Sequence, residues 1–369
     1  MKTKIALTLI ATTFAGSVAA MPTFYAKVDL SLDYLPRDNA KQKDHDHFQL
    51  DSNNTWIGVK GDEKLNDRLS VVYQSEWTFM LKRNSNETFT PRNQFIGIKD
   101  KKLGTLKYGK NDTPLKQLGV LVDSYNHAVE NNADMQGIMS GENRIDNTLT
   151  YEAPSLKIDD AKVDFSLMLP IGPSDHIEKS KGGAKVAGKD IGRTFSGSVL
   201  YKSPVFTGGL AYDYGIPSNF LRKGYITATD THTSTSGAFA AANTIRAIGR
   251  VDLDNGLSLR GLYQNAQVNK ENGNSTSSLN IDQANSWLVG AEYKLPQAEK
   301  WTLKAQYTQT NTDMKNGKQD RDIWQVMGGA DYAFSKKLRT YGYAGYLTLE
   351  EGAKEDHQLL IGSGVEWKF

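Results

Sequence analysis

Cysteine is missing from all 369 residues of the chain. Its absence excludes a disulfide scaffold, a catalytic thiol and a thiolate metal site. Long apolar runs are also scarce, because no stretch after residue 14 approaches the roughly 20 apolar residues of a membrane-spanning helix. A soluble protein fits this profile, and so does a membrane barrel, since alternating apolar and polar residues average to a polar composition.

An excess of either charge is lacking as well. The formal net charge is +2, and removal of Lys2 and Lys4 with an N-terminal segment would leave 42 basic residues beside 42 acidic ones. Proteins that bind nucleic acid usually carry a strongly basic balance, which this chain does not have. Any ionic preference must therefore come from the local placement of charges.

The N-terminus has the three parts of an export signal. Lys2 and Lys4 precede the apolar residues 5–14, and the small residues 17–20 then offer a cleavage site. A transmembrane helix is the alternative, but the apolar run is too short for one. We therefore expect residues 1–20 to be removed as a signal peptide and residues 21–369 to form the exported domain.

Alternation of residue types is abundant. Over residues 359–369 the odd positions are mostly apolar or aromatic, and the chain stops at Phe369. The 17 Tyr, 13 Phe, 6 Trp and 33 Gly suit strands with aromatic residues at a membrane interface. Sixteen alternating segments occur, at about 23–34, 48–61, 68–79, 92–100, 103–110, 145–153, 161–169, 194–202, 205–214, 244–253, 257–268, 284–295, 300–311, 322–334, 337–348 and 357–369.

The connections predict how these strands are arranged. Short turns such as 202–204, 254–256 and 335–337 fall between longer polar loops, as in barrels with short periplasmic turns and long outer loops. We therefore predict an all-β, 16-stranded antiparallel transmembrane β-barrel with a water-filled interior. A soluble β-sandwich is disfavoured, because it would bury Lys27, Asp29 and Glu76 without partners.

One connection, about 111–143, is far longer than most loops of compact domains. Leu115, Leu118, Val122 and Ile138 give it apolar contacts, so we expect it to be packed. Folded against the wall of a barrel, it would narrow the channel.

Four segments together carry a family resemblance. Residues 103–115 lead into the long connection, residues 144–154 leave it, and residues 55–61 and 92–98 lie on earlier strands. In this order, with the signal sequence and the terminal Phe369, they resemble the general porins of Gram-negative bacteria, in particular the neisserial and β-proteobacterial trimeric type.

The resemblance implies a homotrimer of 16-stranded barrels in the cell outer membrane, each with its third outer loop folded inward, and no cofactor. In that family acidic groups on the loop face basic groups on the wall. Here the corresponding residues are Asp123, Glu130, Asp134 and Glu142 on the loop, and Lys27, Lys60, Arg92, Lys110 and Arg144 on the wall. Trp56 stands where the family commonly has a basic residue, and Lys110 replaces the usual arginine. Both changes weaken the basic side and predict a weak preference for cations.

Three other patterns are weaker. Residues 183–190 nearly spell a phosphate-binding loop, but Asp190 replaces the required hydroxyl and no helix follows. Lys179, Lys181, Lys185 and Lys189 could attract anionic solutes or lipopolysaccharide phosphates, although a solvated loop is favoured. His45 and His47 are too few for a zinc site.

The predicted function is passive diffusion of ions and small hydrophilic solutes. A channel selective for sugars or carboxylates is the alternative. A barrel enzyme fits less well, because it usually has fewer strands and a filled interior; the six histidines, in predicted loops or at a strand end, are compatible with a site but are not evidence for one. An adhesive barrel with little conduction would need a lumen blocked by the long loops.

Overall fold

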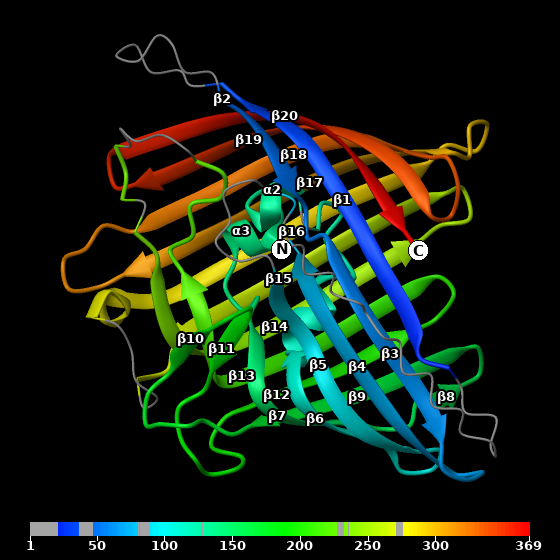
Figure 1. The fold of residues 1–369 in the computed structure, drawn as a ribbon. Coiled ribbons are helices and arrows are strands. Elements are labelled where there is room, and N and C mark those ends of the chain that lie inside the picture. The colour runs from blue at the N-terminus through cyan, green and yellow to red at the C-terminus, as the bar shows by residue number, and fades with distance from the viewer. Residues whose placement is uncertain are drawn as a thin grey trace, which may run out of the picture.

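The computed structural model describes residues 21–36, 47–79, 81, 89–126, 128–226, 232–234, 236–270 and 276–369. In this part of the chain, antiparallel strands follow one another around a closed ring, and Figure 1 shows the first and last strands side by side. The signal peptide predicted over residues 1–20 lies outside the described residues, as does His45. The described helices are too short or too polar to cross a membrane.

Sixteen strand positions form the ring of the described chain, because β2 and β3 both pair with β1 and share one position. They are β1 (Thr23–Leu35), β2 (His47–Ser52) with β3 (Trp56–Lys64), β4 (Leu69–Phe79), β5 (Phe89–Asp100), β6 (Gly104–Asp112), β7 (Arg144–Glu152), β9 (Ala161–Pro170), β12 (Phe195–Lys202), β13 (Phe206–Phe220), β14 (Ala238–Asp252), β15 (Leu257–Val268), β16 (Ile281–Lys294), β17 (Trp301–Met314), β18 (Arg321–Ala333), β19 (Leu338–Glu351) and β20 (Lys354–Lys368). The predicted 16-stranded antiparallel β-barrel is confirmed.

Seven shorter elements lie outside the ring positions in the described chain. They are β8 (Leu156–Ile158), β10 (Glu178–Ser180), β11 (Gly183–Lys185), α1 (Pro114–Gly119), α2 (Ala128–Asn131), α3 (Met135–Ile138) and the 3-10 helix η2 (Thr276–Asn280). β8, β10 and β11 are too short to span a bilayer, because a spanning strand takes roughly 9 to 11 residues.

The two faces of the strands differ as the alternation predicts. Leu359, Ile361 and Val365 on β20 are 40%, 49% and 42% exposed, whereas Leu360 between them is fully buried. Aromatic rings meet where strands end on the outward face, as in the contact of Trp301 with Tyr332 at 5.0 Å. An exposed apolar face with aromatic ends is the surface that a bilayer requires.

The predicted strands agree with the ring except at two places. The second strand is interrupted at residues 53–55, where Asn54 has a φ of 59°, so one predicted strand appears as β2 and β3. β13 and β14 extend beyond 214 and before 244, because pairing resumes between Ile216 and Ala242 after a register shift. Such a bulge breaks the period of two, and the pattern read from the sequence therefore ends there.

Loop lengths follow the predicted alternation with two exceptions. The connections of β17 to β18 and of β19 to β20 belong to the long-loop rim but span only residues 315–320 and 352–353. The connection between β13 and β14 extends to β20 beside one of these short loops, since the backbone N–H of Thr233 donates to Asp356 at 2.8 Å.

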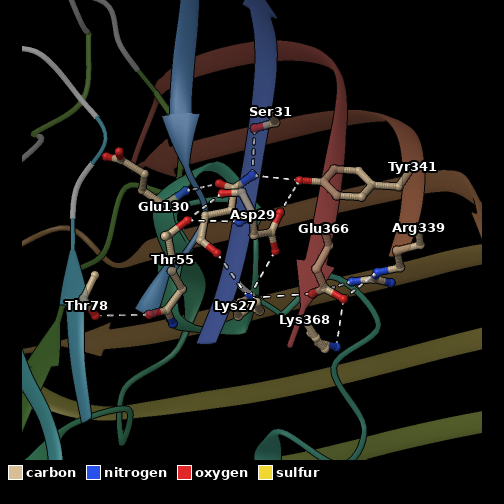
Figure 2. A network of polar contacts seen from close by, with 12 residues as sticks. Lys27, Asp29, Ser31, Thr55, Thr78, Glu130, Arg339, Tyr341, Glu366 and Lys368 are labelled. Carbon is tan, nitrogen blue, oxygen red and sulfur yellow. Dashed lines mark hydrogen bonds and ion pairs between the residues drawn. The ribbon is translucent and has the colours of Figure 1, made fainter. Parts of the chain in front are cut away.

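The inward face of β1 is densely packed. Lys27 and Asp29 are each 4% exposed, and their side chains form an ion pair at 3.1 Å. Figure 2 shows the surrounding network, in which the Tyr341 hydroxyl donates to Asp29 at 2.6 Å and Arg339 pairs with Glu366 at 3.0 Å. Charges can be buried here because each one has a partner.

Candidate functional site

The long loop, residues 113–143, connects β6 to β7; residues 111 and 112, counted with it from the sequence, still belong to β6. Two of its helices have side-chain N-caps. Thr113 accepts the backbone N–H of Lys116 at 3.1 Å, and Asp134 accepts that of Gln136 at 2.8 Å. Such caps satisfy donors that short helices leave open.

The long loop packs on the polar face of the strands. The Ser124 backbone N–H donates to the Gln306 side chain at 2.8 Å, and the Gln325 amide donates to the Ala133 carbonyl at 2.9 Å. In Figure 1, α2 and α3 lie within the outline of the ring. Its expected apolar contacts are confirmed, since the buried cluster includes Leu115, Leu118, Val122 and Ile138.

Arg246 on β14 holds both ends of the long loop. It is fully buried, donates to the carbonyls of Leu115 at 3.1 Å and Ser140 at 3.2 Å, and pairs with Glu142 at 2.7 Å. Burial raises the pKa of Glu142, and the charge of Arg246 opposes this shift. Sequence reasoning missed Arg246, although a charge between the apolar Ile245 and Ala247 was a usable signal.

A cavity of about 460 Å³ opens beside the long loop. Its lining includes six of the ten residues proposed from the sequence: Arg92, Asp123, Glu130, Asp134, Glu142 and Arg144. The wall strands and the long loop therefore supply charges to one space.

Two basic side chains of the wall, Arg92 and Arg144, line the cavity and are held by ion pairs. Asp112 accepts from Arg144 at 3.0 Å and from Lys116 at 3.1 Å, while Arg92 contacts Glu76 and Asn54. Burial lowers the pKa of the Lys116 amine, and Asp112 opposes this shift. Asp112 and Lys116 were not among the residues proposed from the sequence.

The loop carboxylates at the cavity differ in their surroundings. Asp123 accepts from the backbone N–H of Met135 at 3.0 Å and is 5% exposed, and the capping Asp134 is 1% exposed. Glu130 is only half-buried. Its backbone N–H donates to the Asn53 side chain at 3.0 Å, and Figure 2 shows it at the edge of the inner network.

The other four proposed residues lie elsewhere. Lys27 belongs to the inner network, and the amine of Lys60 lies 4.9 Å from the Tyr25 ring. Trp56 contacts the same ring, with centroids 5.2 Å apart. Lys110 pairs with Asp146 at 2.9 Å.

The described chain holds no cluster of three or more residues suited to a metal ion. Of the two histidines considered for zinc, His47 begins β2.

A closed barrel with an apolar outer surface and a charged inner cavity defines an outer-membrane channel protein. The profile of the Gram-negative porin family matches residues 6–352, and the chain belongs to that family. It is 22% identical over 375 residues to the major outer membrane protein P.IB of Neisseria sicca, covering 100% of this chain and 99% of that protein. Family membership points to a channel in the outer membrane rather than to an enzyme.

Two solved structures show the same fold. The anion-selective porin from Comamonas acidovorans has a TM-score of 0.67 and 16% identity, covering 95% of this chain and 99% of that one. The trimer form of OmpT from Vibrio cholerae has a TM-score of 0.62 and 15% identity, with the same coverage.

Proposed function

We propose that the long loop narrows the bore to a hydrated passage at the 460 Å³ cavity, through which ions and small hydrophilic solutes diffuse. The observation that carries this proposal is the meeting of wall cations, Arg92 and Arg144, with the loop carboxylate Glu130 at one cavity. Charges on opposite sides of confined water create a focused field across it.

The balance of charge supports a weak preference for cations. Among the described lining residues, the basic side chains are Arg92, Lys116 and Arg144, and the acidic ones are Asp112, Asp123, Glu130, Asp134 and Glu142. Asp112 is paired with Arg144 and Lys116, and the acidic lining residues outnumber the basic ones. The anion selectivity named for the Comamonas porin does not carry over at 16% identity.

A channel for a particular sugar would need aromatic rings along its path. None of the described lining residues of the cavity is aromatic. Two arginines paired with carboxylates do not form a ladder for carboxylate solutes either. General diffusion therefore fits the cavity better than a selective channel.

The test is reconstitution of the mature protein in a planar bilayer under a KCl gradient. We expect stepwise conductance and a reversal potential that indicates a modest cation preference. Absence of steps would reject the channel, whereas strong anion preference would reject only the assigned selectivity.

We also propose that the protein is a homotrimer whose outward face contacts lipid and lipopolysaccharide. The trimer form named for the OmpT structure and the exposed apolar residues on β1 to β5, such as Leu32, Ile57 and Ile96, support this assembly. Sedimentation in detergent should give the mass of three chains. A monomer at micromolar protein would contradict it.

A further inference from the structure

The connection between β9 and β12 contains a hairpin that the sequence suggested would be solvated. Its strands β10 and β11 pair from Glu178 with Lys185 to Ser180 with Gly183. Residues 178–185 are here called the Lys-rich hairpin. Figure 1 shows both strands within the outline of the ring.

The turn of the Lys-rich hairpin is bound to the wall beside the long loop. Lys110 on β6 donates to the carbonyl of Lys181, and Arg144 on β7 donates to that of Gly182 at 3.2 Å. Ala184 also forms a parallel bridge with Ile145. Two residues proposed for the basic side of the pore therefore hold the hairpin.

Apolar packing against the wall strands also holds the hairpin. Ala184 is 1% exposed and lies in a buried cluster with Met168 on β9 and Ile216 on β13. Met168 is on the inward face of β9, because its neighbour Leu167 is 40% exposed on the outward face. A solvated loop would not bury such side chains.

Residues of the hairpin line two open spaces. Gly182 and Gly183 line the 460 Å³ cavity, while Lys179 lines a second cavity of about 280 Å³ with Arg222 and Lys223. None of the described residues lining the second cavity is acidic. The hairpin therefore contributes to the walls of both spaces.

We infer that the Lys-rich hairpin is a second constriction element. Together with the long loop, it limits the size of the solutes that cross the barrel. This inference rests on the proposed diffusion function. It assigns part of the size limit to residues 178–185, which lie outside the loop that the family resemblance points to.

Two glycines of the same connection provide a matched test. A Cβ at Gly182 would lie 1.9 Å from the Pro91 carbonyl oxygen, whereas a Cβ at Gly192 would meet nothing within 4 Å. Both have left-handed φ values, 70° and 84°, so a side chain strains both backbones alike. Only Gly182→Val should therefore push the hairpin off the wall.

The readouts are single-channel conductance and the entry of sugars of increasing size into liposomes. We expect Gly182→Val to conduct about half as much as the wild type and to exclude sugars that the wild type admits, because a hairpin pushed off the wall moves into the bore and the narrowest section limits current. Gly192→Val should match the wild type. Unchanged conductance and size limit in a folded Gly182→Val barrel would overturn the inference, whereas a silent wild type would overturn the proposed function itself.

A cross-link tests the position of the hairpin without displacing it. Ala184 and Ile145 are paired, and the chain has no cysteine, so Ala184→Cys with Ile145→Cys offers a single possible disulfide. We expect the bond to form in the membrane-embedded protein with wild-type conductance. A bond that forms only with a fall in conductance would show that the hairpin normally lies elsewhere, and would overturn the inference.

Discussion

The long loop and the Lys-rich hairpin both leave the wall and line the same cavity, but they are held in different ways. The long loop is bound through the buried guanidinium of Arg246 and an ion pair with Glu142. The hairpin is bound through its own carbonyls and a close approach of Gly182 to the wall. In both cases wall cations bind backbone carbonyls, and the long loop adds a carboxylate of its own, Glu142, to the contact.

The largest effect should come from removing the side-chain attachment. Arg246→Met leaves Glu142 buried without its partner and frees two carbonyls. We expect the free energy of unfolding to fall by about 3 to 5 kcal/mol, the range for breaking a buried ion pair. Urea unfolding of the barrel refolded in detergent measures this change.

Two further variants sharpen that result. Arg250 pairs with Asp252 at 2.8 Å near the surface, so Arg250→Met should cost less than about 1 kcal/mol. Adding Glu142→Leu to Arg246→Met removes the stranded charge and should restore part of the stability. Equal losses in Arg246→Met and Arg250→Met would contradict the assigned role of Arg246.

A smaller loss should follow when the tip of the long loop is released. The Asn53 side chain accepts from the Glu130 backbone and donates to Ser31 at 2.7 Å. Val129, next to Glu130 in the chain, has a φ of 50°, a strained value for a β-branched residue. Asn53→Ala should cost about 1 to 3 kcal/mol and increase current noise, because the tip moves more freely. Noise at the wild-type level would show that the tip is held by other contacts.

A change in ion selectivity should accompany loss of a wall cation. Arg92 lines the cavity, whereas Lys60 lies outside it beside Tyr25. Arg92→Gln should raise the cation-to-anion permeability ratio about two- to fivefold, equivalent to about 0.4 to 1 kcal/mol for one charge in water. Lys60→Gln should leave the reversal potential in a KCl gradient unchanged. A larger effect of Lys60→Gln would place the constriction elsewhere.

The smallest effect concerns the outer side of the hairpin. Lys179 lines the second cavity, and its amine lies 5.3 Å from the Phe239 ring. Lys179→Gln should reduce anion entry only at low salt, because the Debye length falls to about 10 Å at 0.1 M. Conductance measured at two KCl concentrations tests this, and an equal effect at both would contradict it.

The fold could be predicted because a period of two assigns each residue to a face. Leu303 is exposed on the outward face of β17, and Lys27 lies inward on β1. The prediction stopped where bulges break the period, as between Asp213 and Ile216. It recovered six of the residues at the cavity, because loop charges and wall charges were sought together.

The rest of the site could not be predicted from neighbouring residues. Arg246 meets Leu115 across 131 positions, and Lys110 meets the Lys181 carbonyl across 71. The hairpin lysines suggested a solvated loop; Lys179 and Lys181 are exposed, whereas Lys185 is half-buried and paired with Glu178 at 2.9 Å. Which charges meet depends on how the strands close.

The sequence by itself determined the strands, their two faces and the existence of a long packed loop, because these follow from local periodicity and composition. Only the tertiary structure decided which charges are paired and which remain to line the cavity. Closure of the ring brings Asp29 and Tyr341 together across 312 residues, and no local pattern encodes the geometry of such a contact.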